Sequence, residues 1–147
     1  CYADARTLEL RLSSLNGIEL YLPWKLDLAR TRIEAIEPGA FWDMARLEKL
    51  QLDKNKISII EPYTFAGLNK LEELRLAKNK IQVVKSSAFR GLHNLERLRL
   101  DRNQINNIEN GAFAGLDRLE EVNLRGNQVT CADARTAGLP QSVYCRD

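Results

Sequence analysis

Hydrophobic and polar residues alternate over short stretches in the middle of the chain, and each stretch ends close to an asparagine. Residues 95–105 read LERLRLDRNQI, in which leucines alternate with arginines and Asn103 lies two positions before Ile105. The period of two predicts a short strand with one buried face. Because such a strand buries little apolar surface alone, we expect it to pack beside other copies of itself.

The same pattern recurs every 24 residues. The copies begin at Pro23, Leu47, Leu71, Leu95 and Leu119. The first copy is degenerate, with Thr31 in place of the asparagine, and the last departs from the pattern at Cys131. Stacked copies place their strands side by side about 4.8 Å apart as a parallel sheet. This arrangement predicts continuous core rows, such as Leu50, Leu74, Leu98 and Val122.

This register resembles the extracellular leucine-rich repeat, L-x-x-L-x-L-x-x-N-x-I. The matching asparagines are Asn55, Asn79, Asn103 and Asn127. The resemblance implies an α/β-type solenoid, a curved crescent with a parallel sheet on its concave face and a mostly irregular or 3-10 convex side. We expect one structural domain with an N-terminal cap (1–22), five repeats (23–130, the last partial) and a short C-terminal cap (131–147).

Two other residue types in the repeat have structural interpretations. A buried asparagine must be hydrogen-bonded, and its amide can join backbone groups of neighbouring turns. A phenylalanine recurs with the same period and predicts an aromatic spine on the convex side, rather than a cofactor pocket. Its copies are Phe41, Phe65, Phe89 and Phe113. We therefore predict no cofactor.

Residues 7–22 resemble the N-terminal cap of animal leucine-rich repeat proteins. Leu8, Leu10 and Leu12 alternate with polar residues, as an added strand would. The family's cap usually carries four cysteines in two disulfides, whereas this segment has only Cys1. Either the cap lacks a disulfide, or Cys1 pairs with a residue upstream of this chain.

The three cysteines are confined to the two ends of the chain, at Cys1, Cys131 and Cys145. This distribution favours structural disulfides and an extracellular location, either secreted or anchored at the cell surface. We predict a disulfide between Cys131 and Cys145. Pairing of Cys1 with Cys131 is disfavoured, because the solenoid separates them by several strands.

Charge is nearly balanced, with 22 basic and 20 acidic residues and a net charge of +2. This balance gives no general reason to expect nucleic acid as a partner. No apolar run approaches the roughly 18 residues of a membrane span, so no membrane insertion is expected. We expect a monomer.

The third and fifth positions of each copy flank the core leucines and are predicted to point out of the concave face. Their charge varies between copies, which suggests a surface diversified for contact. The second position, by contrast, is repeatedly glutamate and the eighth repeatedly basic, and both margins are interpreted as solvated surface. The acidic candidates for ligand binding are Asp27, Asp53, Glu73, Asp101 and Glu121. The other candidates are Lys49, Gln51, Arg75, Arg97, Arg99 and Asn123.

Arginines suit carboxylate or phosphate groups, whereas carboxylates suit cationic ligands. The balance between these two sets stays open, but we favour the acidic set, because neighbouring glutamates can neutralise the arginines.

No catalytic motif or metal-ligand pattern is present. A glycosidase-like pair of Glu73 and Glu121 is disfavoured, because Arg97 between them would lower the pKa that a general acid needs raised. We predict a protein that is not an enzyme.

Among leucine-rich repeat proteins, the chain looks most like the variable lymphocyte receptors and related immune proteins. That resemblance implies binding of an antigen or a microbial (bacterial) surface component, protein or glycan, on the concave sheet. The alternatives are a matrix, adhesion or guidance protein that binds a host protein, and an excised domain of a larger receptor.

Overall fold

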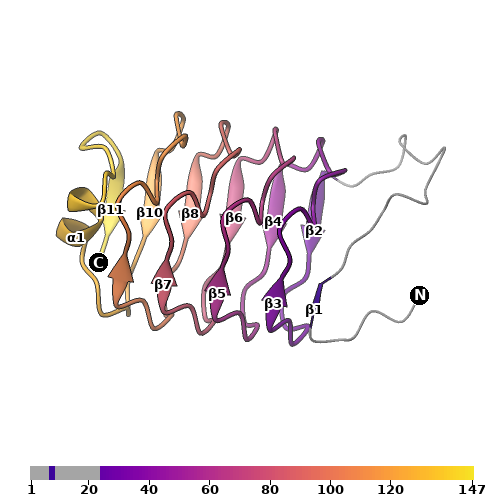
Figure 1. The fold of residues 1–147 in the computed structure, drawn as a ribbon, viewed down its shortest axis with the longest axis horizontal. Helices are drawn as coiled ribbons and strands as arrows, with labels where there is room; N and C mark the ends of the chain where they lie inside the picture. The colour runs from indigo at the N-terminus through magenta and orange to yellow at the C-terminus, as the bar shows by residue number, and fades with distance from the viewer. Residues whose placement is uncertain (1–6, 9–23) are drawn as a thin grey trace.

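The computed structural model describes residues 7–8 and 24–147, which form a solenoid with two rows of strands (Figure 1). The main row is a six-stranded parallel sheet in the order β11-β10-β8-β6-β4-β2. Its strands are β2 (Lys25–Asp27), β4 (Lys49–Gln51), β6 (Glu73–Arg75), β8 (Arg97–Arg99), β10 (Glu121–Asn123) and β11 (Tyr144–Arg146). The parallel-sheet solenoid that the 24-residue period predicted is confirmed.

The strands of the main sheet are in strict register, so equivalent positions of successive repeats lie side by side. Leu50 pairs with Leu74, Leu74 with Leu98, and Leu98 with Val122. These four side chains are at most 1% exposed. Each three-residue strand therefore contributes one residue to the core and presents the two flanking side chains on the opposite face, which we call the sheet face.

The repeated asparagines join the turns that follow the strands. Asn79 accepts a hydrogen bond from the backbone N–H of Ile57 at 3.1 Å. Its amide nitrogen donates to the carbonyl oxygens of Leu52 at 3.0 Å and Leu76 at 3.1 Å. Asn103 repeats this pattern one turn further along. Each asparagine thus satisfies buried backbone groups of two adjacent turns, as expected for an amide in this position.

The four phenylalanines form the predicted aromatic spine. Successive ring centroids are 6.1, 6.2 and 6.5 Å apart, and the rings are nearly parallel. Gly67 belongs to the turn beside this stack, with a φ of +93°. A Cβ atom there would lie 2.4 Å from the carbonyl oxygen of Trp42, so only glycine fits between the two turns.

The second row of the solenoid consists of two-residue strands separated by irregular turns. These are β1 (Thr7–Leu8), β3 (Ala35–Ile36), β5 (Ile59–Ile60), β7 (Val83–Val84) and β9 (Asn107–Ile108). β5, β7 and β9 form one parallel sheet, and β1 pairs with β3 in another. The N-terminal segment thus adds its strand to the second row. The rest of the predicted cap, including Leu10, Leu12 and Cys1, lies outside the described residues.

The C-terminal cap contains a short helix and one further strand. α1 (Cys131–Thr136) begins with a capping box, in which the Thr130 hydroxyl accepts from the Asp133 N–H and the Asp133 carboxylate accepts from the Thr130 N–H. The hydrogen bonds that this carboxylate accepts from the backbone N–H and the hydroxyl of Thr130 lower the pKa of Asp133. β11 then extends the main sheet beyond β10. The predicted Cys131–Cys145 disulfide is present and joins α1 to β11.

Removing this disulfide should weaken the C-terminal end of the solenoid. Replacing Cys131 and Cys145 by serine should lower the free energy of unfolding by about 3 kcal/mol, because the bond closes a loop of roughly 15 residues. Urea denaturation of the oxidised protein and the double variant measures the difference. If both unfold at the same urea concentration, the bond contributes nothing to the stability of the cap.

Candidate functional site

The sheet face carries two rows of side chains that stand in register across the six strands. One row reads Lys25, Lys49, Glu73, Arg97, Glu121 and Tyr144. The other reads Asp27, Gln51, Arg75, Arg99, Asn123 and Arg146. The backbone beneath both rows is uniform, while the side chains above it differ from strand to strand. The outward positions of this face therefore differ in charge and length from copy to copy.

Asp53 lies at the edge of this face and is committed to internal contacts. It is 8% exposed, and one carboxylate oxygen accepts a hydrogen bond from the backbone N–H of Ala77 at 2.9 Å. The other oxygen lies 2.7 Å from Nε of Arg75. Because the carboxylate is largely buried and its two oxygens face a backbone amide and a guanidinium, it presents little surface to a ligand. Asp53 thus stabilises the turn and neutralises Arg75.

Asp101, at the equivalent position two repeats later, is also paired with an arginine. It is 6% exposed and accepts two hydrogen bonds from the guanidinium of Arg99, both at 3.1 Å. Because the guanidinium is the partner of this carboxylate, the hydrogen bond raises the pKa of Arg99. The pair fixes the direction of the arginine side chain on the sheet face.

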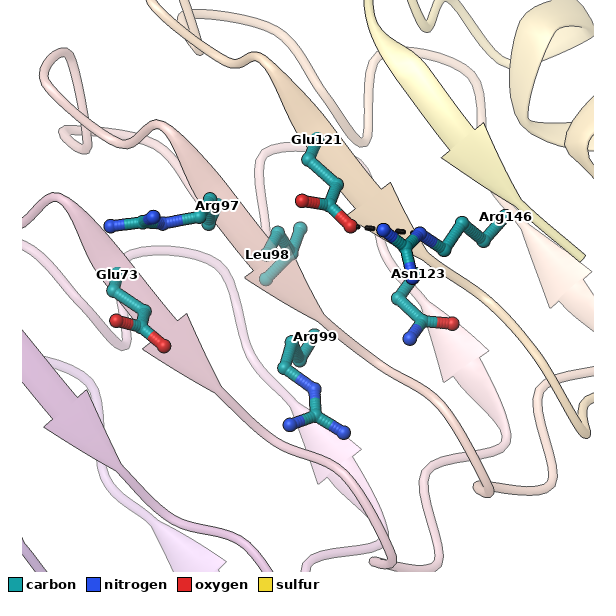
Figure 2. Close-up of a pocket in the computed structure, with 7 residues that line it drawn as sticks. All are labelled: Glu73, Arg97, Leu98, Arg99, Glu121, Asn123 and Arg146. Carbon is teal, nitrogen blue, oxygen red and sulfur yellow. Dashed lines mark ion pairs between the residues drawn. The ribbon is translucent and has the colours of Figure 1, made fainter.

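Glu73 and Glu121 line a hollow of about 310 Å³ over β6, β8 and β10 (Figure 2). Glu121 pairs with Arg146 at 3.0 Å, and Glu73 lies 3.8 Å from the ammonium of Lys49. Arg97, on the strand between them, is exposed and forms no ion pair with any other described residue. Figure 2 shows its side chain directed away from Glu121. Arg97 is thus a free cation in the middle of the sheet face.

Asp27 lies apart from this hollow. Its carboxylate accepts from the backbone N–H of Ala29 at 3.0 Å, and it lines a second hollow with Arg30, Gln51 and Asp53. The five predicted carboxylates therefore do not form one acidic patch. Glu73 and Glu121 line the first hollow, and Asp27 and the buried Asp53 line the second. Asp101 is buried and accepts hydrogen bonds from Arg99. The preference for the acidic set stays a prediction, and each of these acids has a partner within the fold.

Two residues of β11 extend the face beyond the predicted set. Tyr144 and Arg146 flank Cys145, which packs against the core. The sequence signal for them was the same alternation that marks the repeats, a polar or aromatic residue on each side of an inward one. It was missed because residues 144–146 lie outside the 24-residue period.

No group of three or more His, Cys, Asp or Glu side chains among residues 7–8 and 24–147 is arranged to hold a metal ion. In the same part of the chain, no helix has the length and apolar character needed to cross a membrane.

Comparison with known proteins identifies the repeat. A family model described as leucine rich repeat matches residues 25–81 and 70–129. Among solved structures, TLR13 in a complex with ssRNA13 is 30% identical, with a TM-score of 0.65, over 70% of this chain and 14% of that one. The leucine-rich repeat protein LIC12759 of Leptospira interrogans is 26% identical, with a TM-score of 0.68, over 83% of this chain and 30% of that one. A comparison with curated protein sequences finds no match.

The family match, the structural similarity and the stacked asparagine turns agree with one another. This chain spans less than a third of the length of either solved structure, so it corresponds to a part of those proteins. The matched segments together cover most of the chain, from residue 25 to residue 129. The chain belongs to the leucine-rich repeat family, whose members generally serve as binding modules and not as enzymes.

Proposed function

We propose that this protein is an extracellular recognition module that binds an antigen or a microbial surface component through its sheet face. The observation that carries the proposal is the contrast between the two sides of the sheet. Inward positions are nearly uniform, as in Leu50, Leu74 and Leu98, while the outward rows differ in charge and length on the same backbone. A surface kept only for solubility has no need of that contrast.

The electrostatics of the sheet face favour a ligand that carries a carboxylate or phosphate group. Arg97 is exposed and unpaired among the described residues, and Arg99 is held in place beside the same hollow by Asp101. A guanidinium that is already oriented loses less conformational entropy when it binds an anion. An anionic group placed in the hollow between β6 and β10 would contact both side chains.

The Cys131–Cys145 disulfide is compatible with an extracellular location, since such bonds persist in oxidising compartments. The similarity to TLR13, solved in a complex with ssRNA13, supports the use of this fold for ligand capture. Single-stranded RNA is therefore included as a probe beside bacteria. The alternative function is that of a matrix or adhesion protein with a host protein ligand.

Replacing Arg97 by glutamine should weaken capture of bacteria by roughly tenfold or more, because interface hot spots are enriched in central arginines. The side chain is exposed, so the variant should fold normally. Binding of fluorescently labelled whole bacteria to the immobilised protein measures the effect. Lys70→Gln, an exposed cation away from the sheet face, is the matched control and should bind like the unchanged protein.

The same assay separates the candidate functions. Purified matrix proteins and single-stranded RNA are tested beside the bacteria. Tight binding of a host matrix protein with no capture of any bacterium would reject the microbial proposal in favour of the adhesion alternative. Equal capture by Arg97→Gln and the unchanged protein would remove this arginine from the binding site.

A further inference from the structure

A second charged surface follows the turns at the carboxyl ends of the main-sheet strands. The eighth and tenth positions of the first four repeats are almost all basic, and these side chains are exposed. We call this surface the basic edge. Its eighth-position residues are Arg30, Lys54, Lys78 and Arg102. Its tenth-position residues are Arg32, Lys56 and Lys80.

The eighth-position residues are held rigidly. The backbone N–H of Lys54 donates to the carbonyl of Ala77 at 2.9 Å, and that of Lys78 donates to the carbonyl of Asp101 at 2.9 Å. The asparagine that follows each of them, such as Asn79, ties the same turn to its neighbours. The charges are therefore carried on a fixed backbone at the spacing of adjacent strands, about 4.8 Å.

Glycine or asparagine would suit these positions better than lysine or arginine. All four basic residues have φ values between 57° and 60°, in the left-handed region that other residues with a Cβ atom enter at a cost. The equivalent residue of the last repeat is Gly126, with a φ of 71°. Four copies thus keep a long cation where the backbone favours a smaller residue.

The stacked cations also repel one another. The positive charges of Arg30 and Lys78 lower the pKa of the exposed Lys54. None of the four eighth-position side chains forms an ion pair with another described residue, and at the tenth position Lys56 lies 3.9 Å from Glu34. The basic edge keeps its cations despite an unfavourable backbone conformation and mutual repulsion, and both costs would be offset by a polyanionic ligand.

We propose that the basic edge binds a linear sulfated polysaccharide. Evenly spaced cations on a fixed backbone match anionic groups that recur along an extended chain, and binding is strengthened by the release of counterions. A single-stranded nucleic acid fits less well, because proteins bind its bases by stacking on aromatic side chains. The eighth and tenth positions of all five repeats contain none. This surface is separate from the hollow around Arg97.

Replacing Lys78 and Arg102 by asparagine tests the proposal without harm to the fold. Asparagine is favoured in the left-handed region, so the variant should unfold at the same or a higher urea concentration. Its affinity for a heparin dodecasaccharide should fall about ten- to twentyfold at 0.15 M salt, with a shallower dependence of log K on log salt. Isothermal titration calorimetry across a salt series measures both, and capture of bacteria should not change.

The matched control is Lys70→Gln with Arg90→Gln, which removes the same two charges from exposed positions outside the basic edge. It should retain most of the heparin affinity. An equal loss in this control would show that only net charge matters and would overturn the proposal. Tighter binding of single-stranded DNA, duplex DNA or phosphatidylserine vesicles than of heparin would overturn it in favour of those polyanions.

Extending the basic edge provides the opposite test. Gly126→Lys places a fifth cation in line, and its Cβ atom would lie 3.4 Å from Cγ of Arg102, a contact that a flexible side chain accommodates. This variant should bind the dodecasaccharide several-fold more tightly. The slope of log K against log salt should steepen by about the amount expected for one additional cation–anion contact. Unchanged affinity in a folded Gly126→Lys variant would mean that the polysaccharide does not follow this row.

Discussion

Replacing Asn79 by leucine should lower the free energy of unfolding by about 2–6 kcal/mol. The substitution leaves the buried N–H of Ile57 without a partner, which costs about 1–3 kcal/mol. It also removes one of the two hydrogen bonds accepted by each of the carbonyls of Leu52 and Leu76, at about 0.5–1.5 kcal/mol each, while those from Asn55 and Asn103 remain. The extra apolar surface of leucine cannot offset this loss, because the site is surrounded by polar backbone. Urea denaturation followed by circular dichroism measures the change.

Asn106→Leu is the matched control for this experiment. Asn106 is exposed, and its side chain forms no hydrogen bond with another described residue, so the same chemical change should cost less than about 0.5 kcal/mol. A comparable loss of stability in the two variants would mean that the amide contacts of Asn79 do not hold the turns together. Asn103→Leu should behave like Asn79→Leu, because it occupies the same place one turn further on.

Replacing Phe65 by alanine should cost about 3–5 kcal/mol, the usual range for a phenylalanine removed from a packed core. Phe65 is fully buried and stacks between Phe41 at 6.1 Å and Phe89 at 6.2 Å. Its loss opens a cavity in the middle of the spine and removes two ring contacts. In a solenoid each repeat contacts only its neighbours, so the defect also uncouples the repeats on either side.

Phe113→Ala makes the comparison that identifies the cause. Phe113 ends the spine, has one ring neighbour at 6.5 Å and is 4% exposed. Because one ring contact is lost instead of two, the loss of stability in this variant should be about 1 kcal/mol smaller than in Phe65→Ala. Equal losses of stability would show that burial of apolar area, and not stacking along the spine, sets the cost.

The repeated part of the structure follows from the sequence because the 24-residue period fixes which residues lie next to one another in successive turns. Once residue 74 is known to lie beside residue 98, every other pair in the two turns is fixed by the same shift of 24. The core rows, the asparagine turns and the phenylalanine spine are all consequences of that single register. The Cys131–Cys145 bond was predictable for a different reason, since few cysteines are available to pair.

The ends of the chain follow from the sequence less well. Residues 131–146 form a capping box, a short helix and a strand that adds to the sheet beside β10. These elements lie outside the 24-residue period, and a three-residue strand is too short to be recognised by alternation alone. Its pairing is decided by the open edge of β10, which needs hydrogen-bond partners for its backbone.

The partners of the charged side chains on the sheet face were also decided by the tertiary structure. Asp101 lies two residues after Arg99 in one repeat, whereas Asp53 and Arg75 belong to successive repeats, and the sequence does not state which carboxylates face inward. In the folded protein Asp53 accepts from the N–H of Ala77, 24 residues later, and Asp101 holds Arg99. These contacts give two of the predicted ligand-binding carboxylates partners within the fold, whereas Arg97 forms no ion pair with another described residue.

The sequence by itself thus determined the solenoid, its register and which positions lie on the sheet face, because all three depend on a period that is visible in the chain. Only the tertiary structure decided which charges on that face remain available, and that the basic residues Arg30, Lys54, Lys78 and Arg102 share a left-handed backbone. The physical reason is that ion pairing and backbone conformation depend on distances of a few ångströms between turns, whereas burial in a repeat depends on residue type and period.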